Sequence, residues 1–161
     1  METNTERPAI VRDGWWVVAQ VPLIALACLL PVWWGDPART DAQRLLRLAG
    51  GALLLGAVSM VVAAGIALGR HLTPFPRPRD NAPLRDRGVY GVVRHPIYCG
   101  LVLSSLGWSL WSLSWPGLLF TVFLGVFFDR KAAYEESWLV RRFPAYRDYQ
   151  KRVRKLIPGI Y

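Results

Sequence analysis

The sequence predicts an all-α integral membrane protein with about four transmembrane helices. Of its 161 residues, 53% are hydrophobic and eight are tryptophan, and the mean hydropathy is +0.23. The apolar residues gather in four runs, two of them about as long as a bilayer-spanning helix, which needs roughly 20 residues. The charged residues lie in blocks between these runs and do not alternate along helix faces. This composition indicates a membrane protein and not a soluble core of the same length.

The first apolar run, residues 14–34, is predicted to be the first transmembrane helix. Tryptophan pairs lie at its two ends, as is typical of the two membrane–water interfaces. Two internal prolines bend such a helix, and neighbouring helices can satisfy the carbonyls that this frees. The run is too long for the core of a cleavable signal and follows a segment that carries acids, so we expect it to stay in the mature protein.

The second run, residues 48–69, carries no charge and is predicted to be the second transmembrane helix. It is rich in small residues, which allow two helices to approach closely. We therefore expect it to form a tight helix pair. These small residues are Gly50, Gly51, Gly56, Ala57, Ala63, Ala64 and Gly65.

The segment 70–95 is predicted to be an ordered cytoplasmic loop over the membrane. It contains six arginines and four prolines, and each proline disfavours helix at the residue before it. Apolar runs at 96–113 and 115–130 then predict a helical hairpin of the third and fourth spans. Residues 131–161 are predicted to form an amphipathic cytoplasmic tail helix, which Pro144 kinks or divides.

Basic residues predict the orientation of the spans. Segments 70–94 and 129–161 hold fifteen of the twenty lysines and arginines, whereas 35–47 holds three and the turn near residue 114 holds none. Because basic residues concentrate on the cytoplasmic side, we expect four spans with both termini in the cytoplasm. By length, residues 1–161 are expected to form one membrane domain.

The net charge of +9 and the two cysteines limit the partners that we expect. Blocks of arginine beside apolar runs favour contact with an anionic leaflet over nucleic-acid binding. Cys28 and Cys99 lie in apolar runs without the spacing of metal ligands, so neither a disulfide framework nor a metal site is expected.

One stretch has more specific chemistry than its surroundings, where Arg94, His95 and Pro96 precede Tyr98. Proline fits the first position of a helix, because its missing N–H would have no partner there. We therefore expect a helix to begin here, with Tyr98 one turn inside. The N-terminal end of such a helix suits a carboxylate or phosphate. A helix cap with basic residues at the membrane surface is the alternative.

Glu135 and Glu136 are unusual beside a span, because two carboxylates work against attraction to an anionic leaflet. They need a cationic partner, and the candidates are Arg94, Arg130 and Lys131. A purely structural ion pair is the alternative interpretation. Neighbouring helix positions point about 100° apart, so we expect Glu135 to serve a pocket and Glu136 to serve it less directly.

Two stretches together carry a resemblance to a known family. GVYGVVRHPIYCG, a following apolar hairpin and EESWLVRRFPAYRDYQKRVRKLIPGI resemble the catalytic half of the isoprenylcysteine carboxyl methyltransferases and the related phospholipid N-methyltransferases. The resemblance covers residues 82–160. Membrane sterol and steroid reductases carry a motif similar to RHPxY, and the glutamate pair with its downstream aromatic residues favours the methyltransferases.

The resemblance implies S-adenosylmethionine as cofactor, S-adenosylhomocysteine as product and no Rossmann domain. Lys131 falls where the isoprenylcysteine enzymes have an arginine implicated in substrate handling, and Ala82 replaces a histidine of the family. Carried over by position, the residues implied to line the cofactor pocket are Leu84, Tyr90, His95, Pro96, Tyr98, Glu135 and Glu136.

The chemistry of this cofactor agrees with the residues present. Its sulfonium and ammonium suit a carboxylate and aromatic rings, and its own carboxylate suits a basic or N–H-rich end. For a carboxylate acceptor, Arg130 or Lys131 can hold the substrate; for an amine, Glu135 or Glu136 can take the proton. The expected catalytic residues are Arg94, Arg130, Lys131 and Glu135. A lipid-like acceptor is expected, and both a reductase that uses a nicotinamide dinucleotide and a non-catalytic basic scaffold stay open as alternatives.

Overall fold

The computed structural model describes residues 9–77 and 83–161, with side chains from residue 14 onward. These residues form α-helices and short 3-10 helices, and an isolated parallel bridge joins Val93 to Arg154. The all-helical class predicted from the sequence is confirmed. The elements are α1 Ala9–Trp33, α2 Asp41–Leu68, η1 Gly69–His71, η2 Gly88–Gly91, α3 Pro96–Ser112, α4 Trp115–Arg142 and α5 Tyr146–Arg152.

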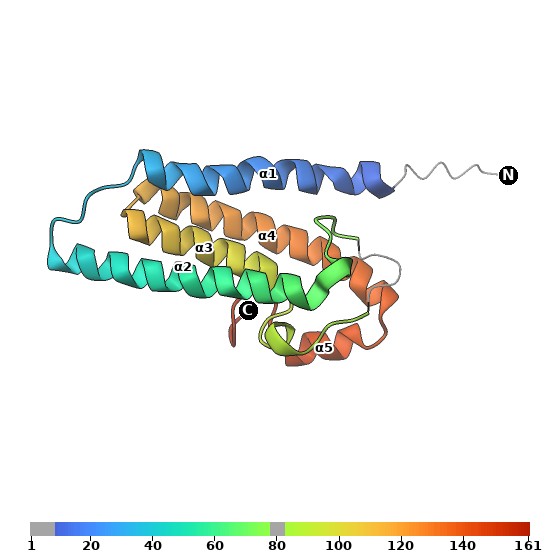
Figure 1. Ribbon diagram of the computed structural model, residues 1–161. Coiled ribbons are helices and arrows are strands. Elements are labelled where there is room, and N and C mark those ends of the chain that lie inside the picture. The colour runs from blue at the N-terminus through green and yellow to red at the C-terminus, as the bar shows by residue number, and fades with distance from the viewer. Residues whose placement is uncertain (1–8, 78–82) are drawn as a thin grey trace.

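The four long helices lie side by side, with α3 and α4 between α1 and α2 (Figure 1). Helix α2 packs on α3, α3 packs on α4, and α1 packs on both α4 and α3. One end of the bundle carries the α1–α2 loop and the α3–α4 turn. The other end carries η2, α5 and the segment that follows α5. Segments that are far apart in the sequence therefore meet at this second end.

Glycines set the distance between α2 and α3. A Cβ added at Gly107 would lie 2.7 Å from the nitrogen of Leu54 and 2.8 Å from the carbonyl oxygen of Gly50. At Gly100 it would lie 2.5 Å from a methyl carbon of Val61. The tight pairing predicted for the second apolar run is confirmed, because the two backbones approach closer than any side chain would permit.

Helix α2 begins seven residues earlier than the predicted span of 48–69. Thr40 accepts a hydrogen bond from the nitrogen of Gln43, and the Gln43 side chain accepts one from the nitrogen of Thr40. This reciprocal capping box fixes the start of the helix at Asp41. The polar residues before Leu48 therefore form the first turns of α2 and do not remain a loop.

The predicted hairpin of the last two apolar runs is present. Leu113 takes a left-handed conformation with φ 55° and ends α3, and the Ser114 hydroxyl accepts a hydrogen bond from the nitrogen of Gly117 at the start of α4. Between the two helices, the buried hydroxyls of Ser105 and Thr121 lie 2.7 Å apart. This bond satisfies two polar groups that would otherwise be costly inside an apolar bundle.

The segment 131–161 differs from the predicted tail helix. Helix α4 continues without a break to Arg142, because no proline or glycine interrupts residues 126–142. Pro144 then divides the helix as expected, and α5 is only seven residues long. After α5 the chain is extended at Val153 and pairs with Val93 through Arg154, so its last part belongs to the site end of the bundle.

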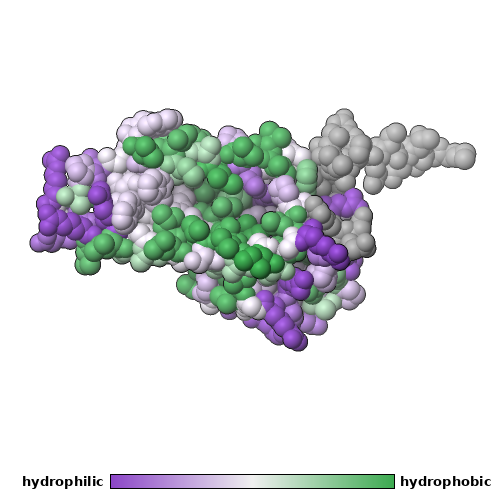
Figure 2. Space-filling view, in the orientation of Figure 1, coloured by the Kyte–Doolittle hydropathy of each residue, from purple (hydrophilic) through white to green (hydrophobic). Residues whose placement is uncertain are grey.

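The outer faces of the long helices are apolar. Two described stretches, Gly14–Trp33 and Asp41–His71, are long and apolar enough to cross a membrane. Figure 2 shows hydrophobic surface along the body of the bundle and hydrophilic surface gathered toward its ends. Soluble monomers rarely expose contiguous apolar surface of this extent, which lipid would cover in a bilayer. Large exposed apolar residues include Val18, Val21, Leu48, Leu55, Val62, Ile66, Leu119 and Val122.

Candidate active site

A cavity of about 340 Å³ lies at the end of the bundle where α3 begins. This volume is in the range of small-molecule sites. Residues from α1, α2, α3, α4, α5 and the loops before α3 line it. Eight of the ten residues predicted from the sequence take part, namely Leu84, Tyr90, Arg94, His95, Pro96, Tyr98, Lys131 and Glu135. The other two do not line the cavity: Arg130 is exposed, and Glu136 is directed at Arg94 and Gln150.

The start of α3 faces this cavity. Pro96 occupies the first turn of the helix as predicted, His95 is the N-cap residue, and no side chain caps this end. The backbone N–H groups of Arg94 and His95 donate to the carbonyls of Arg154 and Lys155, at 2.8 and 3.1 Å. The chain after α5 therefore fixes the orientation of the motif, and the N-terminal end of α3 stays directed at the cavity.

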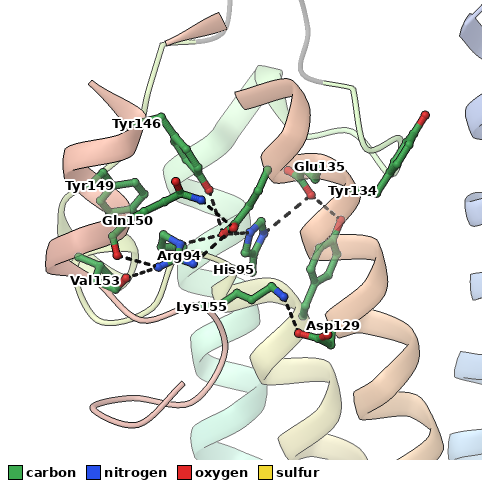
Figure 3. A network of polar contacts seen from close by, with 12 residues as sticks. Arg94, His95, Asp129, Tyr134, Glu135, Tyr146, Tyr149, Gln150, Val153 and Lys155 are labelled. Carbon is green, nitrogen blue, oxygen red and sulfur yellow. Dashed lines mark hydrogen bonds and ion pairs between the residues drawn. The ribbon is translucent and has the colours of Figure 1, made fainter. Parts of the chain in front are cut away.

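Arg94 links several segments of the protein through hydrogen bonds. Its Nε donates to Glu136 at 2.7 Å, and its Nη1 donates to the carbonyls of Gln150 and Val153 (Figure 3). One guanidinium thus joins the start of α3 to α4, α5 and the segment beyond. The sequence placed Arg94 among the catalytic residues. In the structure its donors are bound to protein acceptors, which is a positioning role.

Glu136 is the acceptor at the centre of this network. Besides Arg94, it accepts hydrogen bonds from the Tyr146 hydroxyl at 3.3 Å and from the Gln150 amide at 2.9 Å, and it lies 3.1 Å from Nε2 of His95. Burial alone would raise its pKa, but hydrogen bonds with His95 and Arg94 and electrostatic attraction to these side chains lower the pKa to about 2. Its cationic partner is Arg94, one of the three predicted candidates.

Glu135 points the other way, into the cavity. Its Oε2 accepts a hydrogen bond from the Tyr98 hydroxyl at 2.8 Å and lies 3.8 Å from Nδ1 of His95. The His95 ring is stacked on Tyr98, with 5.5 Å between centroids. Two segments forty residues apart in the sequence therefore meet at these atoms. Burial raises the pKa of Glu135, and His95, Tyr98 and Lys131 partly offset this.

Lys131 lies one helical turn before Glu135 and is fully buried. Its amine donates to the side-chain oxygen of Gln20 in α1 and, at 3.0 Å, to the carbonyl of Pro74. The amine also lies 5.3 Å from the centre of the Tyr98 ring. Burial lowers the pKa of Lys131 to about 8, although the charge of Glu135 works in the opposite direction.

Some of the residues that build this site were not predicted from the sequence. Gln20 was not singled out, although a lone amide inside an apolar run of residues 14–34 is a signal, because intramembrane polar groups are costly and need partners. Tyr149 was given no role of its own among the aromatic residues after the glutamate pair, and its hydroxyl donates to the carbonyl of Tyr90. No sequence signal pairs these two tyrosines. Ala82, expected at the place of a family histidine, lies outside the described residues.

The described residues contain no group of three or more histidine, cysteine, aspartate or glutamate side chains that could hold a metal ion. What they provide is a cavity with one carboxylate and one ammonium inside, aromatic walls and an uncapped helix end. Such a set can bind a small molecule that carries both signs of charge.

Comparison with known proteins identifies the family of this chain. Residues 45–146, well over half of the chain, match the model of the phospholipid methyltransferase family. The chain belongs to this family of membrane methyltransferases.

The chain is also similar to individual proteins over part of its length. A protein-S-isoprenylcysteine O-methyltransferase of Schizosaccharomyces pombe is 35% identical over 104 residues, which is 63% of this chain and 43% of the relative. The enzyme of that name from Dictyostelium discoideum is 33% identical over 92 residues, 52% of this chain and 36% of its own. A steroid 5-alpha-reductase of Solanum lycopersicum is 31% identical over 74 residues, 46% of this chain and 28% of its own. The chain thus matches less than half of the length of each.

Proposed function

We propose that this protein transfers a methyl group from S-adenosylmethionine to a lipid or lipid-like acceptor at the cytoplasmic membrane interface. The observation that carries the proposal is the meeting of His95 and Glu135 across one cavity, 3.8 Å apart between Nδ1 and Oε2. Family membership supports it, since the matched region of residues 45–146 includes both residues.

The cavity fits the chemical groups of the proposed cofactor. Glu135 offers a carboxylate for the ammonium or the sulfonium, and the uncapped end of α3 offers N–H groups and a partial positive charge for the carboxylate. Tyr90 and Tyr98 lie in the cavity wall, and aromatic rings are favourable neighbours for a cationic centre. The volume of about 340 Å³ suits one small molecule in extended contact with these walls.

When bound, the cofactor supplies an electrophilic methyl group, whose bond to sulfur breaks as the acceptor atom attacks. The chain's contribution is alignment and exclusion of water, which can supply most of the acceleration in a displacement of this kind. His95 and Tyr98, stacked on each other, hold Glu135 in one orientation. Lys131 lies on the same side as Glu135 and is the candidate to favour an anionic acceptor group.

The acceptor is proposed to reach the cavity from the bilayer. Leu68 of α2 and Leu101 of α3 lie in the cavity wall, so apolar side chains line part of it. We propose four spans, formed by α1, α2, α3 and the first part of α4, with the cavity at the cytoplasmic ends. Residues 70–94 and 129–161 contribute to the cavity wall and carry most of the basic residues. This distribution supports placing the cavity on the cytoplasmic side of the membrane.

Glu135→Gln tests the proposal, because it keeps the shape of the side chain and removes its charge. A charge-assisted hydrogen bond contributes on the order of 1.5 to 3 kcal/mol, so affinity for adenosylhomocysteine should fall roughly ten- to a hundred-fold. Titration of adenosylhomocysteine into purified protein measures this.

Asp129→Asn is the matched control. It removes a carboxylate from the same helix, where Asp129 binds Lys155 at 2.6 Å outside the cavity. Its affinity for adenosylhomocysteine should stay close to that of the wild type. Equal, unchanged affinity in both variants would mean that Glu135 has no part in cofactor binding, as the scaffold alternative requires.

The second candidate function is reduction with a nicotinamide dinucleotide, favoured by the similarity to a steroid 5-alpha-reductase over 74 residues. A binding comparison separates the two. Saturable binding of adenosylhomocysteine, with none of the reduced dinucleotide phosphate, supports the methyltransferase. The reverse result supports the reductase.

A further inference from the structure

We infer that Gln20 of α1 is a positioning residue that holds Lys131 in place as a cation, so that the Glu135 carboxylate stays ionised for the methyl donor. The inference rests on the proposed function, because it concerns the same cavity. It also gives the first helix a part in the site, although the family resemblance covers only residues 82–160.

The Lys131 amine lies where three segments of the chain meet. This amine is fully buried, and the two oxygens that accept its hydrogen bonds, from Gln20 and Pro74, are both neutral. Three separate segments, α1, the loop after η1 and α4, therefore converge on one ammonium. Neutral acceptors satisfy its donors and leave its charge uncompensated, so the charge acts on whatever lies next to it.

What lies next to it is Glu135, one helical turn further along α4. Glu136 already has Arg94 at 2.7 Å, whereas Glu135 accepts a hydrogen bond from the Tyr98 hydroxyl and lies 3.8 Å from Nδ1 of His95. The Lys131 amine lies on the face of that same tyrosine ring. A buried ammonium and a partly buried carboxylate on either side of one ring attract each other more strongly than they would in water. Lys131 thus adds to His95 and the Tyr98 hydroxyl in favouring the charged form of Glu135.

The directions of the pKa shifts agree with this pairing. Burial lowers the pKa of Lys131 to about 8 and raises that of Glu135, and each group's charge partly offsets the shift of the other. Without an acceptor on α1, the Lys131 cation loses a hydrogen bond in a buried position and gives up its proton more readily. Glu135 would then lose its compensating charge, and its pKa would rise further.

Other charged and titratable groups also face this pair, and they are unchanged by a substitution in α1. They come from the loops, α3, α4 and α5, and they are His71, Arg85, Tyr90, Arg94, His95, Tyr98, Glu136, Tyr146 and Tyr149. A shift produced by replacing Gln20 can therefore be assigned to Lys131 and the groups coupled to it.

The test measures adenosylhomocysteine affinity of the full chain across a pH series from about 5.5 to about 8.5, a range in which a shifted carboxyl can titrate. In the wild type, affinity falls as pH falls through the pKa of Glu135. In Gln20→Leu this fall should begin at higher pH, so that at intermediate pH the variant binds roughly tenfold more weakly than the wild type. At the alkaline end the two proteins should converge, because Glu135 is ionised in both.

Two further variants test whether the effect of replacing Gln20 comes from its hydrogen bond to Lys131 or from the packing of α1. Gln20→Glu keeps an oxygen within reach of the amine and favours the cation, so it should show no shift toward higher pH. Leu23→Ala removes apolar contact between α1 and the cluster around Leu124 while leaving Gln20 intact. It should leave the midpoint of the pH dependence unchanged. Equal midpoints in the wild type and Gln20→Leu would overturn the inference, and so would an equal shift in Leu23→Ala.

A different result would refute the proposed function and leave the Gln20–Lys131 contact to be tested separately. If the wild type bound no adenosylhomocysteine at any pH, the function would be refuted and the pairing would be tested by thermal unfolding. Gln20→Leu, Lys131→Met and the double variant form a cycle. Non-additive effects on the unfolding midpoint support the Gln20–Lys131 contact, and additive effects overturn it.

Discussion

Glu135 and Glu136 are neighbours on α4, yet their surroundings give the two carboxylates opposite preferences for a proton. Glu136 is enclosed by Arg94, His95, Tyr146 and Gln150, and its pKa is lowered to about 2. Glu135 faces the cavity, and burial raises its pKa. The same residue type therefore stabilises the fold at one position and is a candidate to bind the cofactor at the next.

This difference predicts how stability depends on pH. Because the pKa of Glu136 is about 2 in the folded protein and 4.5 when unperturbed, its contribution to stability is present above pH 4.5 and is lost as pH falls toward 2. The contribution is on the order of 3 kcal/mol, and breaking a buried pair costs about 3–5 kcal/mol. Glu136→Gln should therefore unfold at a markedly lower temperature in detergent at pH 7, with a smaller difference at pH 3.

Glu135→Gln is the comparison for this measurement. Burial disfavours the charged form of Glu135 by more than His95, Tyr98 and Lys131 offset, so the neutral side chain should leave the unfolding temperature at pH 7 unchanged or raise it. A similar loss of stability in both variants would contradict the division of roles between the two carboxylates.

The divergence of the two glutamates follows from the helix period and was predictable from sequence. The partner of Glu136 was predictable only as one of three cations, because the choice depends on how the chain after α5 folds back. Arg94 binds there since its guanidinium can reach the carbonyls of Gln150 and Val153 at the same time. Contacts over more than fifty residues of sequence leave no local pattern.

At the scale of the elements, the contact between α2 and α3 depends on the absence of side chains. Gly107→Ala should force the two helices apart, since its Cβ would lie 2.7 Å from the backbone nitrogen of Leu54. Overpacking of this kind costs about 1–3 kcal/mol, which should lower the midpoint of thermal unfolding.

Gly56→Ala is the matched control for that prediction. Gly56 lies in α2, and an added Cβ there would meet no atom within 4 Å. Alanine is the better helix former by about 1 kcal/mol, so this variant should be as stable as the wild type or more stable. If Gly56→Ala were destabilised as much as Gly107→Ala, the close approach of α2 and α3 would not explain the effect.

The helices themselves were largely predictable, and their ends were less so. Apolar runs located α1 to α4, and Pro96 and Pro144 located two boundaries correctly. The start of α2 was missed because the capping box of Thr40 and Gln43 lies among polar residues that hydropathy assigns to a loop. The pairing of Val93 with Arg154 could not be predicted, because one isolated bridge has no periodicity.

At the scale of the molecule, the proposed four spans place both ends of the chain on one side of the membrane. A reporter that is active only in the cytoplasm, fused after Tyr161, should be active, and the same reporter inserted after Leu113 should be inactive. The physical reason is the concentration of basic residues around the cavity and their absence from the α3–α4 turn. The opposite pattern of activity would exclude this topology.

The bridge between Val93 and Arg154 also sets an order of events during synthesis. The N–H groups of Arg94 and His95 find their acceptors on Arg154 and Lys155, sixty residues later in the chain. At about 5–20 residues per second, the ribosome takes roughly 3 to 12 seconds to cover that distance. During this interval α3, α4 and α5 are all synthesised while the His95 motif lacks its fixed orientation. The site is therefore completed late, after the helices that surround it.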